Sequence, residues 1–161
     1  MAIDNSIPRD RNRVPMFDSD WAVIGKKSIT FAGGTADAIG DHDGTGDPFD
    51  IFTVTGNVIA RVWGVCTTDL VGASATLEVG ITGDTAAVIA QTTGTDIDTG
   101  DLWYDASPDA GIEASSVLTE NVIVNGADII GTVGTANITA GVIDFYCAWY
   151  PLSSDGQVEA A

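Results

Sequence analysis

Residues 142–150 read Val-Ile-Asp-Phe-Tyr-Cys-Ala-Trp-Tyr, and this stretch decides the fold class of the chain. Large apolar side chains occupy every second position, at Ile143, Phe145, Cys147 and Trp149. Successive side chains of a β-strand point to opposite faces, so this period of two predicts a strand with one buried face. The intervening residues, including Tyr146 and Tyr150, are expected to line the other face.

The rest of the body shows the same sequence pattern, which is typical of β-strands. Residues 73–82 alternate in the same way, and glycine-rich turns separate further expected strands at 28–31, 51–55, 58–68, 85–92, 102–105, 121–124, 129–134 and 139–151. Gly56-Asn57 between two apolar runs predicts a tight hairpin. The sequence therefore predicts a single all-β domain over residues 21–161, an antiparallel β-sandwich or jelly-roll-like barrel. Residues 1–20, which are polar and contain two prolines, are expected to form an extended N-terminal arm.

Charge is distributed unevenly along the chain. Five of the six Lys and Arg residues lie in the first 27 positions, whereas residues 28–161 hold nineteen of the 23 Asp and Glu. Residues 1–27 therefore carry a formal net charge of +1 and residues 28–161 one of -18, which together give the -17 of the chain. Nucleic acid phosphates and anionic lipid head groups repel such a surface, so we expect neither nucleic acid nor membrane as a partner.

The sequence also favours cytoplasmic synthesis. No apolar run reaches the ~20 residues that a membrane-spanning helix needs, and no signal peptide is recognisable. Cys66 and Cys147 would then be made as thiols. Each lies in an apolar stretch, so we expect both to be buried and unreactive.

No pattern in the chain indicates an enzyme. His42 is its single histidine, the G-x-S-x-G motif of hydrolases is absent, and the two cysteines are far apart in the sequence. Acidic residues are so frequent that nothing selects two of them as the carboxylate pair of a glycosidase. We therefore expect a structural or binding role.

An acidic, glycine-rich stretch is the one candidate metal site. Oxygen-bearing side chains alternate at Asp41, Asp43, Thr45 and Asp47. Calcium prefers six to eight oxygen ligands, and the stretch begins like an EF-hand loop. It departs from that loop where Phe52 replaces the final glutamate. A solvated acidic turn is the alternative interpretation.

Two groups of residues are candidates for contact with a partner. In the arm they are Arg9, Arg11, Arg13 and Phe17, with Trp21 directly after it. In the body they are Arg61 and Trp63, expected on one strand face with Ile59 and Val65. Two alternatives stay open: the arm folds back on its own body, and Arg61 forms an internal salt bridge.

Within residues 52–156 the chain resembles small structural proteins encoded among the head genes of tailed bacteriophages and prophages. The likeness rests on residues 52–56, 83–93, 140–146 and 150–156, which contain no catalytic or binding motif. The resemblance implies a virion component of the head decoration, or capsid cement, type. Its partner would be the major capsid protein, and its place the capsid exterior.

Physical arguments agree with this implication. An acidic body is disfavoured beside packaged DNA and tolerated outside a shell. Most soluble oligomers have closed symmetry, so we expect a homo-oligomer. A trimer would match the three-fold symmetry positions of a capsid. The alternative function is a glycan-binding module of a tail or fibre, in which exposed tryptophans stack on sugar rings and calcium assists.

Overall fold

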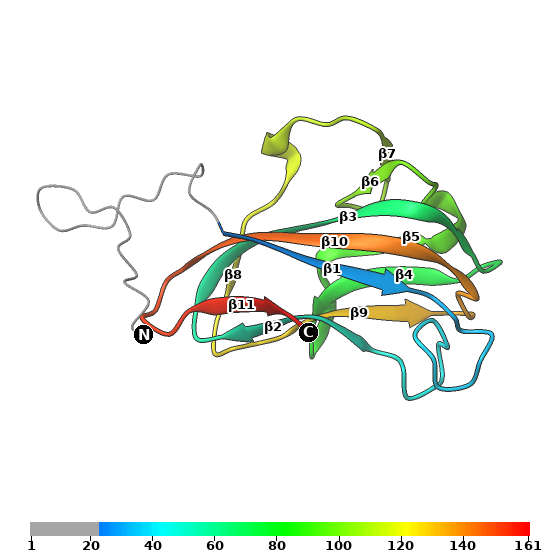
Figure 1. Cartoon of the computed structure of the whole chain (residues 1–161), viewed down its shortest axis with the longest axis horizontal. Helices are drawn as coiled ribbons and strands as arrows, with labels where there is room; N and C mark the ends of the chain where they lie inside the picture. The colour runs from blue at the N-terminus through cyan, green and yellow to red at the C-terminus, as the bar shows by residue number, and fades with distance from the viewer. Residues whose placement is uncertain (1–22) are drawn as a thin grey trace, which may run out of the picture.

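A computed structural model describes residues 23–161, which form a sandwich of two antiparallel sheets (Figure 1). The first sheet has the strand order β1-β10-β3-β6-β7, with β8 also paired to β3, and the second has the order β11-β2-β9-β4-β5. In chain order the strands are β1 Val23–Thr30, β2 Phe49–Thr55, β3 Val58–Val71, β4 Thr76–Ile81, β5 Asp84–Thr93, β6 Asp101–Trp103, β7 Asp109–Ala110, β8 Asn121–Ile123, β9 Ile129–Gly134, β10 Ala140–Pro151 and β11 Gln157–Ala160.

This architecture confirms the predicted all-β sandwich. Two 3-10 turns, η2 at Gly94–Asp96 and η3 at Ser115–Val117, are the only helical elements within the described residues. The jelly-roll-like connection of the strands stays a prediction. The proposed arm at residues 1–20 lies outside the described residues.

Strand β10 is central to the first sheet, between β1 and β3. Its inward side chains, Ile143, Phe145, Cys147 and Trp149, are buried as their spacing predicts. The residues between them are half-buried on the outer face. Burying one face of a strand in this way fixes its register, because a slip of one residue would expose every apolar side chain.

The core fills the space between the sheets, and Trp103 is its largest fully buried side chain among the described residues. This side chain is fully buried and packs edge-on against Phe145, with ring centroids 6.0 Å apart. Its indole Nε1–H donates to Oγ1 of Thr92 at 2.9 Å, which ties β6 of the first sheet to β5 of the second. Gly64 makes room for this packing, since a Cβ there would lie 2.9 Å from Cγ2 of Ile143.

The predicted hairpin at Gly56-Asn57 is wrong. Strand β2 belongs to the second sheet and β3 to the first, so the two strands do not pair. Gly56 adopts a φ of 63°, a conformation that glycine reaches without strain, and the chain passes there from one sheet to the other. The Gly83-Asp84 turn, by contrast, does join paired strands, β4 and β5.

The two ends of the sandwich differ in character. The loops at residues 31–48, 72–75, 94–100 and 135–139 gather at one end, together with the end of β3, and we call this the loop end (Figure 1). Seven carboxylates lie at the loop end: Asp37, Asp41, Asp43, Asp47, Asp96 and Asp98 in the loops, and Asp69 near the end of β3. The start of β1 and the turn between β2 and β3 lie at the opposite end.

Candidate docking surface and acidic loops

The outer face of the first sheet carries a stacked aromatic pair. Trp63 on β3 and Tyr146 on β10 are cross-strand neighbours, and their rings are nearly parallel at 12° with centroids 5.7 Å apart. Lys26 Nζ on β1 lies 5.6 Å from the centroid of the Tyr146 ring. The half-buried outward positions of β3 bear out the expectation that Ile59, Arg61, Trp63 and Val65 share one face.

Both cations on this face are paired with carboxylates. Lys26 Nζ lies 2.7 Å from Oδ2 of Asp144, and Arg61 donates at 2.7 Å to Glu120, which also accepts from Tyr150 at 3.3 Å. The hydrogen bond between Lys26 and Asp144 raises the pKa of the lysine and lowers the pKa of the carboxyl. Arg61 was expected either to contact a partner or to form an internal salt bridge. The structure shows the salt bridge with Glu120, and this pair lies on the candidate face.

Around the aromatic pair, each of the two cations is matched by a carboxylate, although the body as a whole is acidic. Residues 23–161 contain three basic and nineteen acidic side chains, so their formal net charge is -16. All three cations belong to β1 and β3: Lys26, Lys27 and Arg61. Lys27 donates to the backbone oxygen of Ala161 beside β11. A surface where charges cancel is easier to bury against another protein than one with unpaired carboxylates.

Apolar side chains are exposed mainly at the end opposite the loops. Seven large hydrophobic side chains of the described residues are exposed, and five of them lie at this end: Val23, Ile24, Val122, Val124 and Leu152. Val23 is paired with the inward Trp149, and Val122 is paired with the outward Ile59, so these two side chains lie on different faces of the first sheet. We call these five residues the apolar end.

The acidic loop between β1 and β2 is organised around Asp41 and Asn137. Asp41 is buried, and its two carboxylate oxygens accept from the backbone N–H of Asp37 and from Nδ2 of Asn137, each at 2.9 Å. The Asn137 amide also donates to the carbonyl of Gly33 at 2.7 Å and accepts from the His42 N–H at 3.1 Å. Asn137, to which no sequence motif points, therefore joins this loop to the β9–β10 connection.

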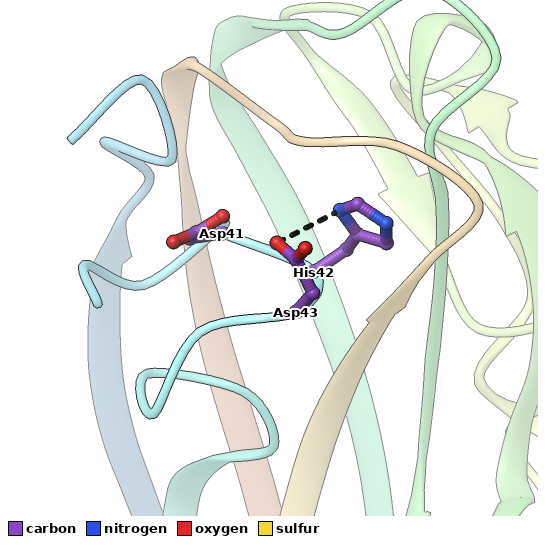
Figure 2. Close-up of side chains that lie close together, drawn as sticks. All are labelled: Asp41, His42 and Asp43. Atoms are coloured by element: carbon purple, nitrogen blue, oxygen red, sulfur yellow. Dashed lines mark ion pairs between the residues drawn. The ribbon is translucent and has the colours of Figure 1, made fainter. Parts of the chain in front are cut away.

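The structure groups the predicted metal ligands only in part. Potential ligand atoms of Asp41, His42 and Asp43 lie within 4.8 Å of one another (Figure 2). The Asp47 carboxylate instead accepts from the Val133 N–H at 2.7 Å, and the Thr45 N–H donates to Asp37 at 3.0 Å. These hydrogen bonds shape the loop itself, and calcium binding stays a prediction.

Asp47 provides a pH-dependent prediction. Burial raises the pKa of this carboxyl, so the folded state binds its proton more readily than the unfolded chain. The resulting destabilisation is complete above the folded-state pKa and disappears as the pH falls through it. We expect Asp47→Asn, which keeps an oxygen for the Val133 N–H, to be more stable than the native chain at pH 7.

The measurement is the free energy of unfolding from urea titrations between pH 7 and pH 4. The advantage of Asp47→Asn should shrink as the pH falls. Asp47→Ala is the matched control: it removes the acceptor and should lower stability by about 1 kcal/mol. An asparagine variant that is no more stable than the native chain at pH 7 would contradict the argument.

The two cysteines are free and buried, in agreement with the sequence. Burial raises the pKa of Cys66 to about 11 and that of Cys147 to about 12. Both thiols are therefore protonated at neutral pH, and a thiolate is the form that acts as a nucleophile. Neither residue fits a reactive role.

The predicted contact residues of the N-terminal segment, Arg9, Arg11, Arg13, Phe17 and Trp21, lie outside the described residues. No protein-family model matches the chain, and comparisons with curated proteins and with solved structures found no significant match.

Among residues 23–161, no helix has the length and apolar character to cross a membrane.

Proposed function

We propose that this chain is a non-enzymatic virion protein that decorates the capsid exterior by binding the major capsid protein. The docking surface in this proposal is the outer face of the first sheet around Trp63 and Tyr146, aided by Arg9, Arg11 and Arg13 of the arm. The resemblance to phage head proteins supplies the class of partner. The geometry of the face supports a binding role.

One observation carries the proposal: an aromatic stack with balanced charges lies on a body that is otherwise strongly acidic. Tryptophan, tyrosine and arginine are the residue types that most often dominate binding energy at interfaces. Trp63, Tyr146 and Arg61 lie together on two adjacent strands. On a body of net charge -16, this is the surface that a protein partner can cover with little cost in unpaired charge.

The position of the loop end supports an orientation of the bound protein in which the acidic loops face away from the capsid shell. Its seven carboxylates lie at the opposite end of the sandwich from the point where the arm joins the body. An arm that reaches the shell would therefore leave the acidic loops toward solvent and away from packaged DNA, which repels them. Attachment of several copies, as in a trimer, would raise the avidity of individually weak contacts.

The test uses the full-length protein and shells assembled from the major capsid protein encoded in the same gene cluster. We expect saturable co-sedimentation, and cleavage of the bound chain by protease added outside sealed shells. Failure to co-sediment at micromolar concentrations would overturn the proposal. Protection from protease, with the chain packed inside against the genome, would overturn it equally.

A further inference from the structure

The turn between β8 and β9 contains the dipeptide Asn125-Gly126, in which Asn125 is exposed. Because glycine has no Cβ, its backbone nitrogen can approach the side-chain amide of a preceding asparagine with little steric hindrance. The other asparagines of the described residues each precede a β-branched residue, which obstructs that approach: they are Asn57, Asn121 and Asn137. Among residues 23–161, Asn125 therefore has the sequence context that most favours attack on its amide.

The backbone of the turn requires this dipeptide. Asn125 has a φ of 58° and Gly126 a φ of 65°. In this left-handed region glycine is unstrained, and asparagine is one of the few residues with a side chain that is tolerated. A Cβ on residue 126 would also lie 3.0 Å from the carbonyl oxygen of Val54. The turn geometry therefore selects two residues that can react with each other.

Hydrogen bonds hold the attacking nitrogen in the folded turn. The Gly126 N–H donates to the carbonyl of Gly56 at 2.9 Å, and the Asn125 N–H donates to Oδ1 of Asn57 at 2.9 Å. Both bonds fix the β8–β9 turn to the turn between β2 and β3. Attack on the amide needs the Gly126 nitrogen free of its proton and the Asn125 backbone free to rotate, so the turn must first open locally.

We propose that Asn125 is a site of spontaneous deamidation and that opening of this turn sets its rate. The Gly126 nitrogen loses its proton to hydroxide and forms a bond to Cγ of Asn125. The bond between Cγ and the side-chain nitrogen breaks, and ammonia leaves. One water molecule then opens the cyclic imide at either carbonyl, which yields aspartate or isoaspartate at this position.

The modification prevents the turn from closing as before. Isoaspartate carries the chain through an additional backbone carbon, so the two N–H groups can no longer both reach Gly56 and Asn57. Either product also places a new carboxylate in the same connection as Asp128, whose Oδ1 accepts from the Val54 N–H at 2.8 Å. Like charges repel, so the modified turn is less stable than the native one.

The experiment follows deamidation of the purified full-length protein at mildly alkaline pH, with and without urea. Digestion after Glu120 releases a peptide that starts at Asn121 and contains both Asn125 and Asn137, so mass spectrometry compares these residues within one molecule. In urea we expect Asn125 to be converted first. In the folded chain its conversion should be at least about tenfold slower, because two hydrogen bonds must open before the amide is attacked.

Three variants test the role of the turn. Asn57→Ala removes the side-chain acceptor of the Asn125 N–H, so deamidation of the folded chain should be about fivefold faster, with no change in urea. Thr53→Ala, at an exposed position of β2, is the matched control and should leave both rates unchanged. Asn125→Gly tolerates the same backbone conformation and lacks the amide, so the mass increase must disappear from the peptide.

Three outcomes would overturn the inference. Equal rates in the folded and the urea-unfolded chain would show that the turn does not protect the amide. Conversion of Asn137 as fast as that of Asn125 in urea would remove the special reactivity of the dipeptide. An unchanged rate in Asn57→Ala, with folding verified by circular dichroism, would show that this hydrogen bond does not control opening. No capsid shell is used, so the inference is independent of the proposed function.

Discussion

Replacing Trp103 with alanine is expected to lower the free energy of unfolding by about 3–5 kcal/mol, the range measured for large aromatic truncations in cores. Trp103 is fully buried, so the truncation leaves a cavity between the two sheets. It also removes the hydrogen bond between its indole N–H and Thr92, and the edge-on contact with Phe145. Chemical denaturation followed by circular dichroism measures the change.

Two controls separate the contributions to this loss. Trp103→Phe keeps most of the ring but lacks the N–H donor, and should cost less than the alanine variant. Thr92→Val leaves the indole N–H without its acceptor in a buried position, which should cost about 1–3 kcal/mol. A loss below 1 kcal/mol in Trp103→Ala would show that this residue does not hold the sheets together.

The predictable part of the fold comes from period-two patterns. In β10 the alternation of Ile143, Phe145, Cys147 and Trp149 was sufficient to predict which side chains are buried. Each side chain of the strand faces either the core or the outer surface. The same logic placed Arg61 and Trp63 on one face. Local alternation reports which side of a strand is buried, and both the core and the candidate docking surface follow from it.

Strand pairing could not be predicted in the same way. Gly56-Asn57 has the composition of a hairpin turn, yet β2 pairs with β11 and β9 whereas β3 pairs with β10. Whether a turn joins neighbours or passes between layers depends on contacts distant in sequence. Strand β11, at Gln157–Ala160, was missed because four residues with one buried side chain, Val158, give too short an alternation.

The role of Asn137 was hidden for a related reason. The carboxylates at residues 37–47 are conspicuous in the sequence, whereas the amide that connects Asp41, His42 and Gly33 lies about a hundred residues away. Side-chain hydrogen bonds to backbone groups leave no periodic signal. The acidic composition was therefore predictable, and the network that orders the loop was not.

If the proposed function holds, substituting Trp63 with alanine should weaken binding to capsid shells by about 30- to 100-fold. A central interface tryptophan typically contributes at least 2 kcal/mol, and 1.4 kcal/mol corresponds to a factor of ten. Loss of Trp63 also removes the ring that stacks on Tyr146. Shell binding is measured by co-sedimentation over a range of protein concentrations, after circular dichroism has shown that the variant is folded.

Salt distinguishes the sheet face from the arm. Lys26 and Arg61 are already paired within the face, so the loss caused by Trp63→Ala should be nearly the same at 0.05 and about 0.5 M salt, where surface charges are screened. Replacing Arg9, Arg11 and Arg13 with alanine should weaken binding at low salt only. Thr53→Ala, an exposed position on the other sheet, is the control and should bind within about twofold of the native chain, because a surface residue outside an interface contributes little. Equal losses in Thr53→Ala and Trp63→Ala would remove the sheet face from the proposal.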